Sequence, residues 1–154
     1  MIDFDDRVAI VTGSGAGLGR SHALGLAARG ARVVVNDLGN AQDVASEIDA
    51  AGGDAMAHDA DVSDEAQVAD MIAKAMDRWG RIDILVNNAG ILRDKTFAKM
   101  TLEDFRKVVD VHLMGSANCC HAVWPVMRAQ KYGRIVLTSS GSGLYGNFGQ
   151  SNYG

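Results

Sequence analysis

The fold is decided by residues 7–19, which read R-V-A-I-V-T-G-S-G-A-G-L-G. The stretch 7–12 is apolar and β-branched and has the length of a buried strand. The glycines that follow form a turn whose bare backbone N–H groups can approach a pyrophosphate, and the N-terminus of a following helix favours its charge. Such a loop can also be only a tight turn, so its position between a strand and a helix carries more weight than its composition.

Further runs of strand length recur along the chain and alternate with helical periodicities. They occupy residues 31–36, 82–87 and 134–139, and a weaker run at 54–59 is typical of an edge strand. Their near-continuous apolarity favours parallel strands that are covered on both faces. The alternating order predicts a doubly wound parallel α/β sheet with right-handed crossovers, arranged in three αβα layers.

Two apolar stripes predict the principal helices. The first helix is expected after Ser63 as its N-cap, with Asp64 and Glu65 in the first turn. The second spans about 101–130, is capped near Thr101, and is expected to be kinked late by Pro125. The apolar positions of the first stripe are Val68, Met71, Ile72, Ala75, Met76 and Trp79. Those of the second are Phe105, Val108, Val109, His112, Ser116, Cys119, Cys120, Val123 and Met127.

Composition limits the class of protein. The 154 residues suffice for one domain over 1–154, and the net charge of −4, with no run of Lys or Arg, disfavours nucleic acid as a partner. No apolar stretch is long enough for a membrane span, and the acidic start lacks a signal peptide, so a cytoplasmic location is expected. The adjacent Cys119 and Cys120 are expected to be buried reduced thiols, and the four scattered histidines predict no metal site.

An acidic residue follows the second predicted strand. Asp37, in V-V-V-N-D-L-G, lies 20 residues after Gly17, where a carboxylate accepts hydrogen bonds from an adenosine ribose. A 2′-phosphate there would meet repulsion of roughly 4 kcal/mol per charge pair at an effective dielectric near 20. Since no Arg or Lys lies in the loop or beside Asp37, NAD is expected rather than NADP. Alternatively, Asp37 is an ordinary turn residue before Gly39.

The segment 87–90 reads N-N-A-G. Together with T-G-x-x-x-G-x-G and a tyrosine 13 positions after Ser140, it resembles the short-chain dehydrogenase/reductase family, from residue 7 to the last. The stretches N-N-A-G-I-L-R-D, V-H-L-M-G-S and Y-G-N-F-G-Q-S-N-Y look like its (3R)-hydroxyacyl-CoA dehydrogenase branch, found in peroxisomal multifunctional β-oxidation enzyme type 2 and bacterial relatives. The resemblance implies a Rossmann-like dinucleotide-binding domain; a peroxisomal location is possible for a eukaryotic chain.

The resemblance also implies a role for each matching residue. Ser140 would hydrogen-bond the substrate oxygen, and Tyr153 would pass the proton as hydride moves to or from nicotinamide. Alternatively, Ser139 and Ser140 simply end a strand. The implied cofactor contacts are Gly13, Ser14, Gly17, Leu18 and Gly19 at the pyrophosphate, Asp61 and Val62 at the adenine, and Asn87, Asn88, Ala89 and Gly90 along the cofactor.

Two departures from the family pattern matter. Many members carry Asn where this chain has His112, which either joins a water-linked proton path or is a packed helix histidine. The family lysine of Tyr-x-x-x-Lys would fall three residues beyond Gly154. A free tyrosine has a pKa of about 10, so ionisation near pH 7 needs roughly 4 kcal/mol that a lysine would help to supply. The sequence is therefore expected to lack the last strands and to be inactive alone, as a fragment or a truncated product.

Two functions agree with these residues. One is an NAD-dependent oxidoreductase that interconverts a secondary alcohol and a ketone, with an acyl thioester, 3-hydroxyacyl-CoA or 3-oxoacyl-CoA, as substrate. The other is a non-catalytic NAD-binding or interaction module. A homo-oligomer is expected if the apolar stripe of 101–130 packs against its copy, and the alternative is that this stripe faces its own sheet.

Overall fold

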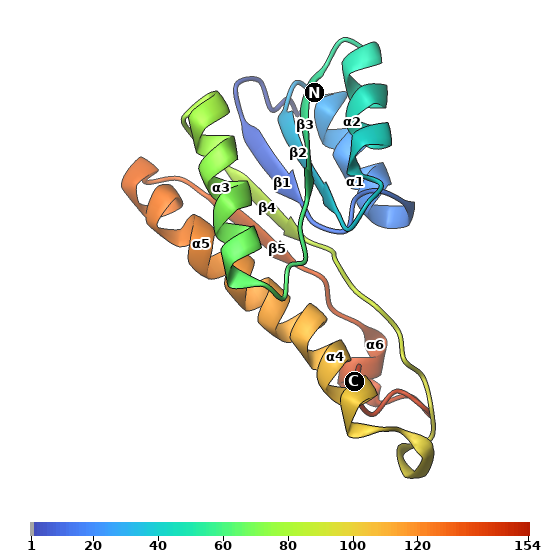
Figure 1. The fold of residues 1–154 in the computed structure, drawn as a ribbon. Helices are drawn as coiled ribbons and strands as arrows, with labels where there is room; N and C mark the ends of the chain where they lie inside the picture. Colours follow the sequence, from blue (N-terminus) through green and yellow to red (C-terminus); the bar gives the residue numbers. More distant parts are fainter. Residues whose placement is uncertain (1) are drawn as a thin grey trace.

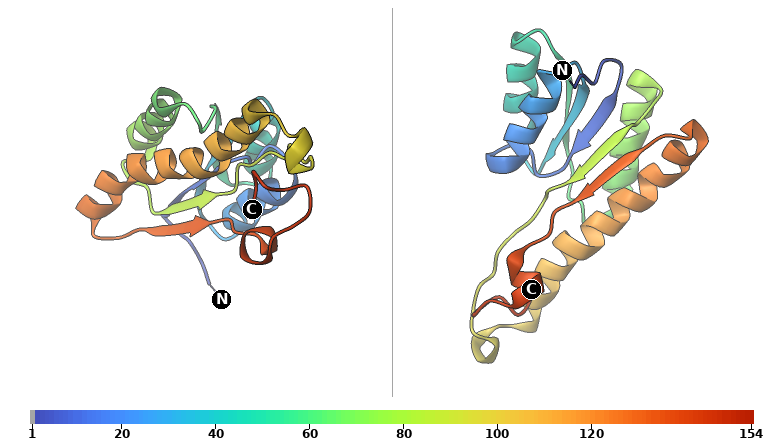
Figure 2. Two further views of the ribbon diagram at one scale, coloured as in Figure 1. Left: turned by 90° about the horizontal axis from the view of Figure 1, so that it is seen from below. Right: turned by 180° about the vertical axis from the view of Figure 1, so that it is seen from behind.

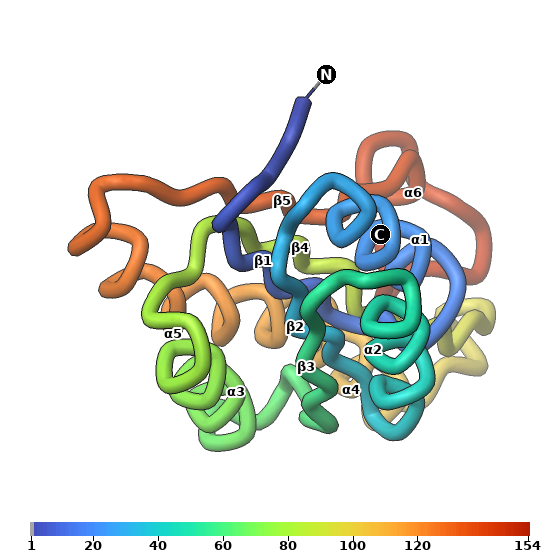
Figure 3. The backbone as a smooth tube through the Cα atoms, turned by 90° about the horizontal axis from the view of Figure 1, so that it is seen from above, coloured from blue at the N-terminus to red at the C-terminus, as the bar shows by residue number. Residues whose placement is uncertain are grey.

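A five-stranded parallel sheet forms the centre of the structure, a computed structural model that describes residues 2–154. The strands are β1 (Val8–Val11), β2 (Arg32–Asp37), β3 (Asp54–Asp59), β4 (Ile84–Asn87) and β5 (Arg134–Leu137). They lie in the order β3-β2-β1-β4-β5, which can be followed across Figure 3. The predicted doubly wound sheet is confirmed, and so is the edge position of β3.

Helices cover both faces of the sheet (Figures 1 and 2). One layer holds α1 (Gly17–Ala27) and α2 (Ala41–Ala50), and the other holds α3 (Glu65–Trp79), α4 (Leu102–Val109) and α5 (Gly115–Gln130). The short elements are a 3-10 turn η1 (Phe97–Lys99), a π-helical segment η2 (Asp110–Met114) and α6 (Gly141–Tyr145). The chain leaves β1 towards β2 on one side and returns to β4 on the other. In such sheets a crevice opens at the carboxyl ends of the strands where the order reverses.

The core is divided by the sheet, because successive side chains of a strand point to opposite faces. On β2, Val33 and Val35 pack against α1 and α2, whereas Val34 packs with Ile10 of β1 against α3 and α5. All four side chains are fully buried. Burial of each contributes roughly 1.5–3 kcal/mol, which explains why these short runs fix the sheet.

All five predicted strands are present, in the predicted order along the chain. Two details of the prediction were wrong. β1, β4 and β5 are shorter than the runs 7–12, 82–87 and 134–139. β5 is not covered on both faces, since Val136 is 51% exposed and Leu137 58% exposed. β5 pairs with β4 alone, at the border of the sheet. The apolar sequence of β5 is therefore not a sign that this strand is buried within residues 2–154.

The helix caps correct one prediction. The N-cap of α3 is Asp64, whose carboxylate accepts hydrogen bonds from the N–H groups of Ala66 and Gln67. Ser63, the predicted cap, instead donates its hydroxyl to Asp61 Oδ1 at 2.6 Å. Thr101 caps α4 as predicted, accepting a hydrogen bond from the N–H of Asp104.

The predicted helix over 101–130 is a run of three segments, α4, η2 and α5. It widens into a π-helical turn at η2, and α5 continues through Pro125 to Gln130. The helix is therefore not interrupted at Pro125, and the π-helical turn upstream of it was not predicted. Buried members of its stripe, such as Cys119, Val123 and Met127, pack towards the chain's own sheet. The buried part of the stripe therefore faces its own sheet, which was the alternative to packing against a copy of the chain. No helix within residues 2–154 is long and apolar enough to span a bilayer.

Candidate active site

The glycine loop between β1 and α1 has a backbone that only glycine adopts easily. Gly13 and Gly17 have φ angles of +59° and +56°, in the left-handed region. A Cβ atom on Gly13 would lie 2.7 Å from the Cα of Ala89, and one on Gly19 would collide with the carbonyl oxygen of Gly13. These two glycines let the loop pack directly against the segment that follows β4.

The start of α1 is open towards the crevice. Among residues 2–154, no side chain caps this helix at Ala16, and a Cβ on Gly17 would have no neighbour within 4 Å. The first N–H groups of a helix lack intrahelical partners, and the helix dipole attracts negative charge there. The loop and the helix start are therefore suited to a diphosphate.

Ser14 lies in this loop but faces inwards. Its side chain is fully buried, and its hydroxyl lies 2.7 Å from the carbonyl oxygen of Val11 and 3.3 Å from that of Asn36. Its backbone N–H donates to the same Asn36 carbonyl at 2.8 Å. Both donors of Ser14 are thus used within the protein, where they join the glycine loop to β2.

Asp37 ends β2 beside the glycine loop. Its Oδ2 accepts a hydrogen bond from the N–H of Gly15 at 2.8 Å, and its Oδ1 accepts one from the N–H of Leu38 at 2.8 Å. Each oxygen has a further lone pair that can accept a hydrogen bond from a ligand. Arg20, the cation that directly follows the glycine loop in the sequence, is held by both carboxylate oxygens of Glu47 at 2.6 Å.

A cleft of about 310 Å³ lies beside Asp37 at the carboxyl ends of the strands. Seven of the predicted cofactor residues line it: Gly13, Asp37, Asp61, Val62, Asn88, Ala89 and Gly90. The others that line it are Asn36, Leu38, Ala60, Ile91, Arg93, Lys107 and Val111. The structure therefore brings together the ends of β1, β2, β3 and β4, which are far apart in the sequence.

Asp61 lies on the wall of this cleft after β3. Its Oδ1 accepts hydrogen bonds from the N–H and the hydroxyl of Ser63, and its Oδ2 lies 3.5 Å from Lys107 Nζ. The Ser63 hydroxyl holds the pKa of Asp61 below its ordinary value, burial opposes this shift, and Lys107 adds to it. Asp61 is therefore ionised at neutral pH and presents an acceptor to the cleft.

The N-N-A-G segment is fixed to the glycine loop by hydrogen bonds. Asn88 Nδ2 donates to the carbonyl oxygens of Thr12 and Gly13, at 2.9 and 3.0 Å. The Thr12 hydroxyl accepts from the N–H groups of Asn88 and Ala89, both at 3.0 Å. The side-chain amide of Asn88 and the backbone N–H groups of Asn88 and Ala89 are thus used within the protein. Ala89 and Gly90, which have a small side chain and none, form the surface that a ligand would contact.

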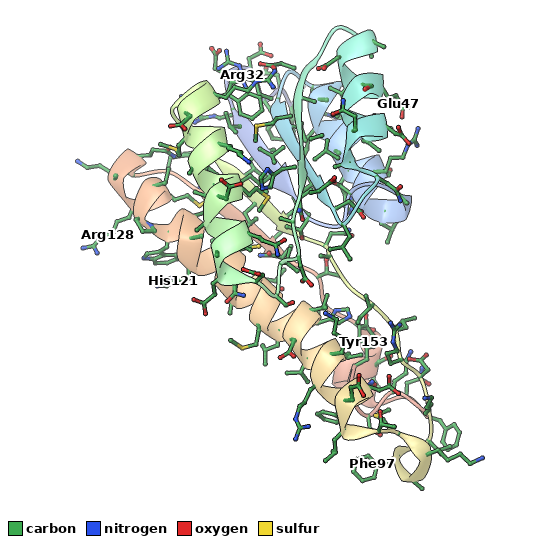
Figure 4. The ribbon with its side chains drawn as sticks, in the orientation of Figure 1. Arg32, Glu47, Phe97, His121, Arg128 and Tyr153 are labelled. Carbon is green, nitrogen blue, oxygen red and sulfur yellow. The ribbon has the colours of Figure 1, made fainter. Side chains whose placement is uncertain are left out.

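A second cavity of about 310 Å³ shares this wall. It is lined by Leu18, Asn87, Asn88, Ala89, Gly90, Ile91, Leu92, His112, Ser116, Thr138 and Tyr153. Asn88, Ala89, Gly90 and Ile91 also line the first cleft. A ligand that follows the wall from Asp37 therefore ends beside Tyr153, which Figure 4 shows near α4 and the end of the chain.

Tyr153 and His112 meet in the second cavity. Their rings contact edge to face, with centroids 5.0 Å apart. His112 Nε2 lies 3.0 Å from the nitrogen and 2.8 Å from the oxygen of Ile91, so its bond depends on the tautomer. A Cβ on Gly90 would collide with this ring. His112 is therefore both packed and adjacent to the tyrosine, in keeping with the frequent occurrence of π-helical turns such as η2 at functional sites.

Ser140 is placed differently from the other predicted catalytic residues. Its hydroxyl caps α6 by accepting a hydrogen bond from the N–H of Ser142 at 3.2 Å. Within residues 2–154 the serine is not among the side chains that line the second cavity, which has Thr138 and Ser116 instead. Of the remaining predicted contacts, Leu18 is 72% exposed and lines the second cavity, and Gly17 and Gly19 lie in the first turn of α1.

Several residues of the site were missed by the sequence analysis. Thr12 joins the glycine loop to β4, and Asn36 Nδ2 supports the wall of the first cleft by donating to the carbonyl oxygens of His58 and Ala60. Arg93 and Lys107 are the cations that border the cleft. A polar residue at the end of an apolar strand was an available signal for Thr12 and Asn36. Within the described residues no group of His, Cys, Asp or Glu is arranged to hold a metal ion.

Comparisons with known proteins agree with this geometry. The model of the short chain dehydrogenase family matches residues 7–154. The peroxisomal multifunctional enzyme type 2 of Drosophila melanogaster is 53% identical over 161 residues, covering 97% of this chain and 26% of that protein. The 3-oxoacyl-[acyl-carrier-protein] reductase of Synechocystis is 45% identical over 150 residues, covering 96% of this chain and 61% of that protein.

A solved structure gives the same result. The crystal structure of a short chain dehydrogenase from Mycobacterium avium superposes with a TM-score of 0.93 at 45% identity, covering 99% of this chain and 60% of that one. The chain thus spans about a quarter to three fifths of the length of these relatives. With its glycine loop, its N-N-A-G wall and a family match over nearly all its residues, this chain belongs to the short-chain dehydrogenase/reductase family.

Proposed function

We propose that this chain is the coenzyme-binding and tyrosine-bearing part of an NAD-dependent oxidoreductase that interconverts 3-hydroxyacyl and 3-oxoacyl thioesters. The observation that carries the proposal is the wall of Asn88, Ala89, Gly90 and Ile91 shared by two cavities. One cavity has Asp37 at its border, and the other has Tyr153. A dinucleotide of extended shape matches this arrangement, with adenosine at Asp37 and nicotinamide at the tyrosine.

The residues present fit such a coenzyme. The left-handed Gly13 and Gly17 and the open start of α1 form a cradle for a diphosphate. Asp37 would accept hydrogen bonds from the adenosine ribose, and Asp61 would accept one from the amino group of adenine. The nicotinamide ring would supply the site that accepts or donates a hydride when the coenzyme is bound.

NAD is proposed over NADP on electrostatic grounds. Both oxygens of Asp37 are held at the cleft by backbone N–H groups, so a 2′-phosphate would meet a fixed negative charge. The guanidinium of Arg20, which follows the glycine loop, is engaged by Glu47. Repulsion of roughly 4 kcal/mol at an effective dielectric near 20 would then oppose NADP.

The proton chemistry is assigned to Tyr153. Its hydroxyl would donate a proton to the substrate oxygen during reduction and accept it back during oxidation. His112, in edge contact with the tyrosine ring, would hold that ring in place and take part in proton exchange through water. We keep Ser140 as a proposed hydrogen-bond donor to the substrate oxygen, a role that its cap of α6 neither requires nor forbids.

The substrate class comes from the relatives. One carries the name of a peroxisomal multifunctional enzyme and another that of a 3-oxoacyl-[acyl-carrier-protein] reductase. The name of the second, together with the resemblance to the hydroxyacyl-CoA dehydrogenase branch, supports an acyl thioester with an oxygen function at carbon 3. We also keep as proposals an intracellular location, cytoplasmic or peroxisomal, and a homo-oligomer. Exposed apolar side chains on the outer side of the long helix, Leu113 and Trp124, favour the oligomer.

The experiment measures oxidation of NADH by acetoacetyl-CoA with the full-length protein. Tyr153→Phe should lower kcat about 10²- to 10⁴-fold, the usual contribution of a general acid or base. NADH affinity, measured by fluorescence titration, should stay within about twofold, since only the hydroxyl is removed. Full activity of Tyr153→Phe would sink the assignment of the proton donor.

The alternative function, a non-catalytic NAD-binding module, is separated by the same assay. Calorimetric binding of NAD by residues 1–154, together with the absence of turnover in the full-length protein, would support the module and overturn the proposed activity. Tyr145→Phe is a matched control, because this tyrosine is 89% exposed and lines neither cavity within residues 2–154.

A further inference from the structure

The end of the described chain is tied to the loop that follows β4. We call residues 147–154 the tyrosine segment and residues 91–96 the β4 loop. The N–H of Lys95 donates to the carbonyl oxygen of Gly149 at 2.9 Å. Gln150 Nε2 donates to Asp94 Oδ2 at 2.8 Å, and Asn152 Nδ2 donates to the carbonyl oxygen of Arg93 at 3.2 Å. Figure 2 shows the two segments running together at one end of the molecule.

The contact made by Asn152 differs from the other two because the side chain of Asn152 is buried. It is 7% exposed, whereas the Gln150 contact lies at the surface. Both ends of its side-chain amide are used: the nitrogen donates to Arg93, and Oδ1 accepts from the N–H of Tyr153 at 2.9 Å. A buried amide that loses either partner is left with an unsatisfied polar atom, so this arrangement is held in both directions.

Apart from these contacts, the tyrosine segment is held to α6 by the hydroxyl of Ser142, which donates to Gln150 Oε1 at 2.8 Å. The short α6 ends at Tyr145, and the backbone bonds that follow are turns, such as that from the N–H of Gly154 to the carbonyl oxygen of Gln150. On the opposite side the ring of Tyr153 rests against His112, which is bonded to Ile91 of the β4 loop. Besides His112, Asn152 therefore provides a second connection that fixes the position of Tyr153 relative to the β4 loop.

We propose that Asn152 is a positioning residue that fixes Tyr153 relative to the wall of the second cavity. It acts through Tyr153 and Arg93 and does not itself line either cavity within residues 2–154. This inference rests on the proposed function, because it assumes that Tyr153 transfers the proton. Its physical basis is that a displacement of about 1 Å between reacting groups lowers a rate about 100-fold.

The test compares three variants of the full-length protein, with NADH and acetoacetyl-CoA. Asn152→Ala should lower kcat about 10- to 100-fold, with NADH affinity within about twofold of the parent. Asn152→Asp keeps the acceptor for Tyr153 but turns a carboxylate towards the Arg93 carbonyl. Protonation restores a donor there, so its kcat relative to the parent should rise as pH falls from 8 towards about 5. Asn147→Asp, an exposed amide of the same segment, is the matched control and should stay within about twofold.

Three results would overturn the inference. They are an Asn152→Ala kcat within twofold of the parent, an equal loss of kcat and NADH affinity, and an Asn152→Asp profile that parallels the parent at every pH. The last two indicate a purely structural role. The Tyr153→Phe variant separates this failure from that of the proposed function. Full activity there removes the proposed function, whereas an inactive Tyr153→Phe beside a fully active Asn152→Ala removes only the positioning role.

Discussion

Asp83 and Asp37 lie at opposite ends of the parallel strands. We call these two sides of the sheet the amino edge, where the strands begin, and the carboxyl edge, where they end. Asp83 precedes β4 at the amino edge, is 0% exposed, and accepts hydrogen bonds from the N–H of Val8 and from Arg7 and Arg81. Asp37 ends β2 at the carboxyl edge, borders the cleft and is bonded to two backbone N–H groups. The protein saturates the first carboxylate and leaves the second open to a ligand.

The two carboxylates indicate different roles for the two edges. Burial alone would raise the pKa of Asp83, but the hydrogen bonds from Arg81, Val8 and Arg7 outweigh burial and lower the pKa below its ordinary value. Arg7 is further stacked over the ring of Tyr132 at 4.0 Å. An acid of this kind stabilises the fold, whereas Asp37 would contribute to coenzyme affinity. Substitutions at the two edges should therefore separate stability from binding.

The largest effect is expected at the amino edge. Asp83→Ala leaves two arginines and the N–H of Val8 without their partner, and breaking a buried ion pair costs about 3–5 kcal/mol. Urea unfolding of the variant should show a loss of this size, while NAD affinity of the folded fraction should stay unchanged. A loss below about 1 kcal/mol would contradict the assignment of a structural acid.

The same acid predicts how stability depends on pH. Because the folded pKa of Asp83 lies below the unfolded one, its contribution is present above the unfolded pKa, about 3.9, and is lost as pH falls through the folded pKa. The free energy of unfolding should therefore decline below about pH 4. In Asp83→Asn, which does not titrate, this part of the decline should be missing.

A smaller effect is expected where the glycine loop meets the N-N-A-G segment. Gly13→Ala combines a left-handed φ of +59° with a Cβ that would lie 2.7 Å from the Cα of Ala89, and should cost roughly 3 kcal/mol. Gly17→Ala has a similar φ but no neighbour within 4 Å among residues 2–154, and should cost only about 1–2 kcal/mol. Equal losses in thermal unfolding would show that the contact with Ala89 is unimportant.

At the carboxyl edge the effect should move from stability to binding. Asp37→Ala removes a charged acceptor, worth about 1.5–3 kcal/mol, and should weaken NAD binding roughly 10- to 100-fold by calorimetry. The free energy of unfolding should change by less than about 1 kcal/mol, since the side chain lies at the rim. Unchanged NAD affinity would contradict the proposal that Asp37 binds the coenzyme, and with it the proposed difference between the two edges.

The smallest effect is expected at Lys107, across the cleft from Asp37. Its ammonium lies 3.5 Å from Asp61 Oδ2 and is 48% exposed on the side chain, so the pair is worth about 0.2–1 kcal/mol. Lys107→Met should weaken NAD binding by no more than about fivefold, and the difference should shrink in 0.5 M salt. Lys99→Met, outside the cleft, serves as the control. A loss above tenfold would show a direct contact with the coenzyme.

Local patterns predicted most of the elements, and their failures have local physical reasons. The run D-V-S-D-E has two good capping residues, and only the contact of Ser63 with Asp61 decides that Asp64 caps α3. The strand at 134–139 is apolar enough to be buried, but its position at the border of the sheet leaves it partly exposed. Periodicity also gave no sign of the π-helical turn in which His112 reaches Ile91.

The candidate site was predicted unevenly for similar reasons. Asp37, Asp61 and the N-N-A-G segment follow strands, so a parallel sheet brings them to one edge, as expected. Ser14 faces inwards and Ser140 caps a short helix, because each hydroxyl found a backbone partner that a motif does not encode. Thr12, Arg93 and Asn152 were missed, since their partners are more than 50 residues away in sequence.

The parallel sheet, the glycine turn and the acids at or after the strand ends could be predicted from the amino-acid sequence alone. These depend on side-chain periodicity and on backbone freedom, which act between near neighbours. Which polar groups remain open to a ligand depends on the folded arrangement of the whole chain. A hydroxyl, amide or carboxylate is free only when no distant partner satisfies it, and those partners are brought near by the packing of the whole sheet.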